Sequence, residues 1–447
     1  MKSAIAALTV AFGAASALAG SVTPITIKGN AFFKGNERFY IRGVDYQPGG
    51  SSKVIDPIAD IETCKRDVKY FKELGLNTIR VYTIDNTKNH DECMKLLADA
   101  GIYLVLDVNT PKYSINRADP EISYNAVYLQ SIFATVQMFA KYDNTLAFFS
   151  GNEVINDGKT SAVAPWVKAV TRDIRSFLKE RKLRQVPVGY SAADVDSNRE
   201  QTAHYMNCGS DDERSDFFAF NDYSWCSPSS FETSGWDQKV KKFEDYGIPI
   251  FLSEYGCNIN KRDFSEVEAL YSKEMTGVYS GGLVYEYSQE PSNYGLVEIK
   301  GGASSDPSKL SDFNALKSMF AKVKNPTGDG GYNQKSGSSK CPPKKVPEWD
   351  VDGEKKLPQL PSDAEKYVKN GAGDGPGLKG PGSQSSGSKA QGPDTSGNGK
   401  SGSGGSPGSG GNKDTPDAAA GLRAPEFVVV LAAIGLSTLV GASMMTI

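Results

Sequence analysis

Eight short apolar runs recur along the chain at intervals of about 25 to 40 residues, and this spacing constrains its fold more than any other feature. Each run has the length and the β-branched or aromatic content of one buried strand. The runs cover residues 39–46, 78–82, 103–109, 146–153, 186–192, 217–223, 248–254 and 282–287.

Helical patterns fill most of the gaps between these runs. The clearest begins at Asp56 and Pro57, a favourable N-cap and first-turn pair, and stops at Gly75. Further helices are predicted over residues 133–142, 164–180 and 264–279. Because strands that alternate with helices form parallel sheets, eight such units in about 250 residues predict an α/β fold, a closed (β/α)8 TIM barrel. An open Rossmann-type sheet is the alternative, but no Gly-x-Gly-x-x-Gly motif opens the first helix.

The two ends of the chain carry export signals. Residues 1–19 combine a lysine, an apolar stretch and a final Ala-Leu-Ala triplet, which is typical of a cleaved signal peptide. Residues 418–447 combine small residues, a short spacer and an uncharged apolar tail, the layout of a removed GPI-anchor signal with attachment near Ala418. A C-terminal transmembrane helix is the alternative. We therefore expect a protein anchored on the extracellular face of the cell membrane, or held in the cell wall.

Composition separates a folded body from a stalk. Residues 371–411 are almost wholly Gly, Ser, Pro, Asn, Lys and Asp, which leaves too little apolar surface to offset the entropy of ordering. The preceding segment is intermediate, and Cys341 within it indicates that it is stapled back onto the body. We therefore predict a barrel domain with a disulfide-tethered extension over residues 20–350, followed by a flexible Ser/Gly/Pro-rich stalk over residues 351–417.

The numbers of cysteines, histidines and charges disfavour several classes of function. Six cysteines in an exported chain predict three disulfides, although spacing alone leaves fifteen pairings open. No Cys-x-x-Cys motif occurs and the only histidines are His90 and His204, so zinc sites and Ser-His-Asp or Cys-His enzymes are disfavoured. The net charge is −3 without a basic stripe, which disfavours nucleic acid as a partner. We expect no metal and no cofactor.

Two glutamates end strand-like runs. Glu153 ends the fourth run and Glu254 ends the seventh, each after apolar residues that would bury the strand beneath it. In a TIM barrel the carboxyl ends of the strands meet at one mouth, where active sites lie. Burial raises the pKa of a carboxyl group, which suits a general acid, and two carboxyl groups about 5 Å apart suit retaining glycosyl chemistry. The alternative is that both are solvated strand-end carboxylates.

Six strings stand in order along the successive predicted strand ends: YQPGG, RVYTID, SGNEV, FNDYSWC, SEYGCN and GGLVYEYSQE. Together they resemble the fungal β-1,3-glucanosyltransferases of glycoside hydrolase family 72, which are glycolipid-anchored surface proteins. The resemblance covers about residues 23–324. Since only Cys341 lies beyond the barrel, the chain is similar to the subgroup that lacks a cysteine-rich carbohydrate-binding module there.

The resemblance implies Glu153 as the acid/base and Glu254 as the nucleophile, with Asn152 contacting the 2-hydroxyl of the sugar at the cleavage point. It also implies a set of glucan-binding residues at the mouth, in which the last strand contributes one tyrosine of two that share its face. The set is Gln47, Tyr82, Asp107, Asn109, Tyr113, Arg117, Asp194, Arg199, Tyr223, Tyr285 and Tyr287.

Some of these residues have structural alternatives. Core packing is the alternative role for Tyr82 and Tyr223, and a loop ion pair is the alternative for Asp194 and Arg199. The resemblance also implies three disulfide pairings, which are Cys64–Cys93, Cys208–Cys341 and Cys226–Cys257.

The implied reaction is transfer, in which a glycosyl group held on Glu254 passes to the non-reducing end of a second β-1,3-glucan chain. A β-1,3-glucan hydrolase and a non-catalytic glucan-binding surface protein are the alternatives. The expected partners are β-1,3-glucan donor and acceptor chains and, through a GPI anchor, the plasma membrane. We expect a monomer.

Overall fold

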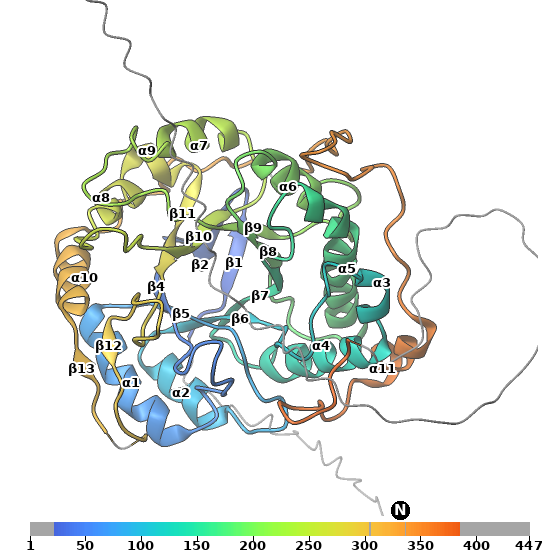
Figure 1. Cartoon of the computed structure of the whole chain (residues 1–447), viewed down its shortest axis with the longest axis horizontal. Helices are drawn as coiled ribbons and strands as arrows, with labels where there is room; N and C mark the ends of the chain where they lie inside the picture. The colour runs from blue at the N-terminus through green and yellow to red at the C-terminus, as the bar shows by residue number, and fades with distance from the viewer. Residues whose placement is uncertain (1–21, 304, 336, 385–447) are drawn as a thin grey trace, which may run out of the picture. The chain divides into compact units, whose positions relative to one another are not determined.

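Eight parallel strands close into a barrel in the computed structural model, which describes residues 22–303, 305–335 and 337–384 (Figure 1). The strands are β4 (Ile41–Asp45), β5 (Thr78–Val81), β6 (Tyr103–Asp107), β7 (Thr145–Asn152), β8 (Val188–Ala193), β9 (Phe217–Asn221), β10 (Ile250–Tyr255) and β11 (Tyr279–Val284). Each pairs with its neighbour in chain order, and β11 pairs with β4 to close the ring. All eight predicted runs contribute a barrel strand, so the TIM-barrel prediction is confirmed.

Helices surround the barrel (Figure 1). They are α1 (Ile61–Leu74), α2 (Asp91–Asp99), α3 (Pro120–Ser123), α4 (Ala126–Phe139), α5 (Ala164–Glu180), α6 (Arg199–Met206), α7 (Trp236–Phe243), α8 (Glu266–Leu270), α9 (Lys273–Thr276) and α10 (Ser311–Lys322). The predicted start of the first helix at Asp56 is wrong. Asp60 caps α1 by accepting a hydrogen bond from the amide of Glu62, while the Asp56 carboxylate accepts one from the amide of Asp85. Gly75 ends α1 with a positive φ of 73°, as its lack of a side chain allows.

An antiparallel sheet that the sequence reading missed covers the amino-terminal end of the barrel. Its strands are β1 (Ile25–Lys28), β2 (Ala31–Lys34) and β3 (Glu37–Phe39). The Phe32 ring packs 6.1 Å from Phe217 and 6.0 Å from Phe251, and Phe39 packs against Tyr103. Because these partners stand first or second in their barrel strands, the opposite, carboxyl-terminal end is the one left for a site.

The ordered chain extends beyond the predicted boundary at residue 350. Two short strands, β12 (Val297–Glu298) and β13 (Ser308–Lys309), and α11 (Glu365–Asn370) lie outside the barrel. Trp349 is fully buried against Tyr205, and Leu357 and Ala372 are buried further along. The stalk predicted over residues 351–417 is therefore wrong for residues 351–384, where sparse apolar side chains and backbone hydrogen bonds hold the chain on the barrel.

Other predictions fall outside the described residues. These are the signal peptide at 1–19, the remainder of the stalk and the anchor signal at 418–447. In the parts that the structure covers, no helix is long and apolar enough to cross a membrane. The same residues contain no group of three or more side chains that could hold a metal ion.

Candidate active site

Glu153 and Glu254 lie at the carboxyl-terminal end of the barrel. Glu153 follows the last residue of β7, and Glu254 is the penultimate residue of β10. A hydrogen-bonded chain connects the two strand ends, since Asn221 donates to the Glu153 carboxylate at 2.8 Å and accepts from the hydroxyl of Ser253 at 2.8 Å. The charge of Glu153 also raises the pKa of Glu254, so the two carboxylates share one electrostatic environment.

Three side chains fix the carboxylate of Glu254. The hydroxyl of Tyr82 donates to Oε1 at 2.7 Å, and the hydroxyl of Tyr223 donates to Oε2 at 2.7 Å. The guanidinium of Arg80 lies 3.2 Å from Oε1. The pKa of Glu254 is raised to about 7, because the effect of burial exceeds the opposite effects of the Arg80 charge and the two tyrosine hydroxyls. Each oxygen therefore has a donor that favours the ionised form.

Arg80 is the buried cation beneath the site, and the sequence reading did not single it out. Its guanidinium is completely buried and forms a two-point pair with Asp107, at 2.9 Å from Nε and 3.0 Å from Nη2. Asp45 lies 3.9 Å away, and its oxygens have no hydrogen-bond partner among the described residues. Burial raises the pKa of Asp45 well above its usual range. The available signal was an arginine inside the otherwise uncharged run TIRVY.

Glu153 is held mainly through its backbone. Its φ of 48° lies in the left-handed region, which residues with a side chain seldom adopt. Its amide donates to the carbonyl of Ser191 at 2.9 Å, and its carbonyl accepts from Arg117 at 2.7 Å. The neighbouring Asn152 side chain accepts from Ser191 and Asn221 at 2.8 and 3.1 Å. The strain at Glu153 is thus opposed by hydrogen bonds on both of its flanking peptide groups.

A group of tyrosines lies beside Glu254. The rings of Tyr223, Tyr285 and Tyr294 have centroids 5.3 to 6.3 Å apart and pack edge to face. All three are partly exposed, whereas Tyr287 is fully buried and donates to Asp67 at 2.8 Å. Of the two tyrosines that the sequence left open, the structure places Tyr285 with this group and Tyr287 in the core. Tyr294 was not predicted.

Comparisons with known proteins identify the family of the chain. A family model described as "Glucanosyltransferase" matches residues 14–324. The chain belongs to this family. It is 68% identical over 385 residues to "1,3-beta-glucanosyltransferase gel1" of Aspergillus fumigatus, covering 85% of this chain and 84% of that protein. It is 55% identical to "1,3-beta-glucanosyltransferase GAS5" of Saccharomyces cerevisiae, over 80% of this chain and 74% of that one.

A solved structure matches the fold. It is that of a mutant of Saccharomyces cerevisiae Gas2p in complex with laminaritetraose and laminaripentaose, with a TM-score of 0.71 and 37% sequence identity. The match covers 77% of this chain and 76% of that chain. The present chain and Gas2p therefore share one fold.

Several residues that were predicted to bind glucan make hydrogen bonds within the protein that hold loops in place. Gln47 donates to the carbonyl of Ile55 and accepts from the amide of Thr83, at 2.8 and 3.0 Å. Asn109 bridges the carbonyl of Ser150 and the hydroxyl of Tyr128. Tyr113 is only 1% exposed, so its ring does not line an open mouth.

Asp194 and Arg199 form a buried ion pair, as in their structural alternative. Asp194 also accepts from Lys239 at 2.6 Å, and Lys239 in turn lies 2.5 Å from Asp222. Asp222 immediately precedes Tyr223, so this network supports the residue that holds Glu254.

The structure contains the three disulfides that the resemblance implies. Cys64–Cys93 joins α1 to α2, and Cys208–Cys341 attaches the C-terminal extension. Cys226–Cys257 joins the loops that follow β9 and β10. This third bond therefore ties together the two segments that carry Tyr223 and Glu254.

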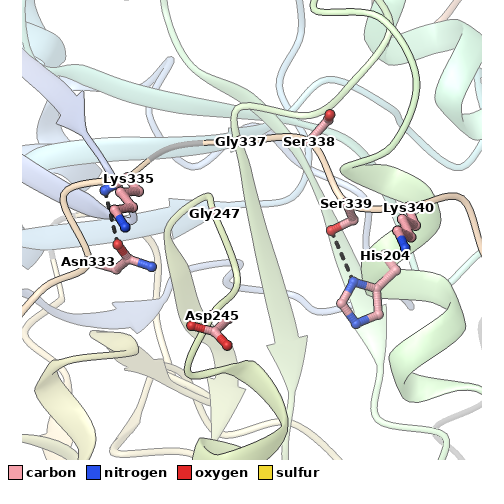
Figure 2. Close-up of a pocket in the computed structure, with 9 residues that line it drawn as sticks. All are labelled: His204, Asp245, Gly247, Asn333, Lys335, Gly337, Ser338, Ser339 and Lys340. Carbon is pink, nitrogen blue, oxygen red and sulfur yellow. Dashed lines mark hydrogen bonds between the residues drawn. The ribbon is translucent and has the colours of Figure 1, made fainter.

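A cavity of about 480 Å³ lies beside His204 and Ser339 (Figure 2). It is lined by residues of α6, the turn before β10 and the segment 333–340, including His204, Asp245 and Lys340. His204 shares a hydrogen bond of 3.0 Å with Ser339, and burial lowers the pKa of its imidazole. Because Gly247 precedes β10, the cavity lies toward the amino-terminal end of the barrel and is separate from the mouth.

Proposed function

We propose that this protein is a retaining β-1,3-glucanosyltransferase that uses Glu254 as nucleophile and Glu153 as acid/base. The observation that carries the proposal is the position of these carboxylates at one barrel mouth, with Glu254 held by Tyr82, Tyr223 and Arg80. Membership of the glucanosyltransferase family and the named activities of the relatives support the reaction class.

In the first step, Glu254 attacks the anomeric carbon of a β-1,3-linked glucose. The carboxyl group of Glu153 donates its proton to the glycosidic oxygen, the bond to that oxygen breaks, and the reducing-end fragment leaves. A covalent glycosyl ester on Glu254 remains. Donation from Tyr82, Tyr223 and Arg80 favours the ionised carboxylate that this attack requires.

In the second step, the ionised Glu153 takes the proton of an incoming sugar hydroxyl. That oxygen attacks the anomeric carbon, and the ester bond to Glu254 breaks. One glycosidic bond has then been broken and one formed, so the donor is shortened and the acceptor lengthened. The tyrosine group of Tyr223, Tyr285 and Tyr294 supplies aromatic surface on which an acceptor sugar can stack in place of water.

Laminari-oligosaccharides are β-1,3-glucans, and Gas2p was solved with two of them. We infer that the present site takes the same class of chain, with Asn152 at the 2-hydroxyl of the sugar being cleaved. Tyr82, Asp194, Arg199, Tyr223 and Tyr285 would form or support the sugar-binding surface.

The predicted export signals support a location at the cell surface for this reaction. We propose that residues 1–19 are removed, that a GPI anchor replaces the segment after about Ala418, and that the monomeric enzyme acts on wall glucan at the extracellular face of the membrane.

Incubation with reduced laminari-oligosaccharides tests the reaction. Transfer yields products both longer and shorter than the starting chain, hydrolysis yields only shorter ones, and a glucan-binding protein yields none. Glu254→Gln, expressed and folded like the parent, is the matched control and should yield no rearrangement. Undiminished rearrangement by this variant would overturn the assignment of the nucleophile.

A further inference from the structure

We propose that residues 375–384, termed here the strap, position the acid/base Glu153 by bracing the loop of residues 109–117. The inference rests on the proposed function, because it assigns a role in that reaction. The strap lies in the Gly- and Pro-rich part of the chain that composition alone predicts to be flexible.

The first anchor of the strap is Asn86, in the connection between β5 and α2. The amide of Gly377 donates to Asn86 Oδ1 at 2.9 Å in a buried contact. Asn86 cannot swing aside, since its own amide nitrogen donates to the carbonyl of Ser131 and the hydroxyl of Thr135, both at 3.1 Å. A Cβ at Gly375 would lie 2.1 Å from the Asn86 side chain, so the chain passes here only as glycine.

The second anchor is Tyr113, in the middle of the braced loop. Its hydroxyl accepts from the amide of Gly382 at 3.2 Å, and a Cβ at Gly380 would lie 2.1 Å from the same oxygen. Since the Tyr113 ring is 1% exposed, it has no room to retreat.

Backbone contacts extend this second anchor to both neighbours of Tyr113. The amide of Ser383 donates to the carbonyl of Lys112 at 3.0 Å, and the side chain of Gln384 donates to the carbonyl of Ser114 at 2.7 Å. The carbonyl of Ser383 accepts from Asn125, the N-cap of α4. The strap therefore holds three successive loop residues against the barrel.

The braced loop ends at the residue that holds Glu153. Arg117 donates to the carbonyl of Glu153 at 2.7 Å, and Glu153 is the residue that adopts the left-handed φ of 48°. Such a backbone conformation persists only where the surroundings impose it. A loop that moved would release Arg117 and allow the Glu153 carboxyl group to leave the position from which it serves both steps.

A positioning role can be separated from a merely structural one by the choice of donor and acceptor. A dinitrophenyl β-laminaribioside has so acidic a leaving phenol that its departure needs no proton from Glu153. Azide as acceptor carries no proton, so the second step needs no base. Misplacement of Glu153 should therefore matter for laminari-oligosaccharide transfer and hardly at all for the aryl donor with azide, whereas loss of folded enzyme lowers both rates equally.

The test uses Gly380→Val in the exported protein, with Lys379→Ala as the matched control because Lys379 is exposed in the same segment. We expect kcat for oligosaccharide transfer to fall by about tenfold to about 100-fold in Gly380→Val, the size expected when a catalytic group is misplaced by about 1 Å. The rate with the aryl donor and azide should stay close to that of the parent. The control should match the parent in both assays.

An unchanged kcat in Gly380→Val, or an equal loss with both donors, would overturn the proposal that the strap positions Glu153. If Gly380→Val does not fold, Gly380→Ala is measured alone and combined with Tyr113→Phe, which removes the oxygen that the new Cβ meets. The double variant should recover transfer relative to Gly380→Ala, and failure to recover also overturns the proposal. Absence of rearrangement by the parent protein would instead defeat the proposed function, so the two failures are distinguishable.

Discussion

The surroundings of Glu254 and those of Glu153 differ in how they hold a carboxylate. Glu254 is 8% exposed, and hydrogen bonds from three side chains reach its two oxygens directly. Glu153 is more exposed, and its position depends on its backbone, with Asn221 as its carboxylate partner. A nucleophile must keep one orientation toward the anomeric carbon, which direct donors provide. An acid/base must exchange a proton with two different oxygens, which suits a group positioned from behind.

Replacing each carboxylate should show this division most strongly. Glu254→Gln should lose transfer by on the order of 10,000-fold or more because no nucleophile remains. Glu153→Ala should lose about 100-fold to about 10,000-fold. With a dinitrophenyl donor and azide, Glu153→Ala should recover and Glu254→Gln should not. Equal responses of the two variants to azide would contradict the assigned roles.

The buried cation beneath Glu254 should matter for stability as well as for the rate. Arg80→Met leaves Asp107 buried without its partner, so the free energy of unfolding should fall by about 3 to 5 kcal/mol. Denaturant titration measures this change. Adding Asp107→Asn should restore part of the loss, because it removes the unpaired charge. Lys65→Met, which removes an exposed cation on α1, should change little, and an equal loss there would argue against a special role for burial.

The tyrosine group offers a comparison between two residues of one segment. Tyr285→Ala should raise the KM for the acceptor about tenfold and shift products toward hydrolysis, because an aromatic surface beside the site is lost. Tyr287→Phe loses only its bond to Asp67, so it should lower stability by about 1 kcal/mol and leave the product ratio unchanged. Chromatography of the products gives the ratio of transfer to hydrolysis for each variant. A changed ratio in Tyr287→Phe would show that the mouth is larger than the structure indicates.

The pH dependence of kcat/KM sharpens the picture of Glu254. Its pKa is raised to about 7 by burial, and the nucleophile must be ionised, so activity should rise as the pH increases through this value. Because the Tyr82 hydroxyl lowers this pKa, Tyr82→Phe should move the acidic limb of the profile to higher pH and reduce kcat by about threefold to about tenfold. Tyr287→Phe serves as the control. A limb that moved to lower pH would contradict the hydrogen bond to the carboxylate.

Local sequence patterns predicted much of the fold. The helix predicted over residues 164–180 has those bounds in the structure, because its apolar periodicity and termini are encoded within the segment itself. The predicted bounds of the last strand were wrong. The prediction is 282–287, and the structure has the strand at Tyr279–Val284. Two glycines within Tyr279–Val284 weaken its strand pattern, and pairing with β4 and β10 decides where it lies.

Sequence by itself determined the eight-unit barrel, the two strand-end glutamates and, through family resemblance, the roles proposed for them. These properties follow from periods of a few residues or from strings that stand in order, so they can be recognised in the sequence alone. Tertiary structure alone decided that Tyr285 rather than Tyr287 joins the site, that Arg80 lies beneath Glu254, and that a glycine-rich segment packs on Tyr113. Each of these depends on contacts between residues distant in the chain. The surface on which the glycine-rich segment packs exists only once the barrel has formed.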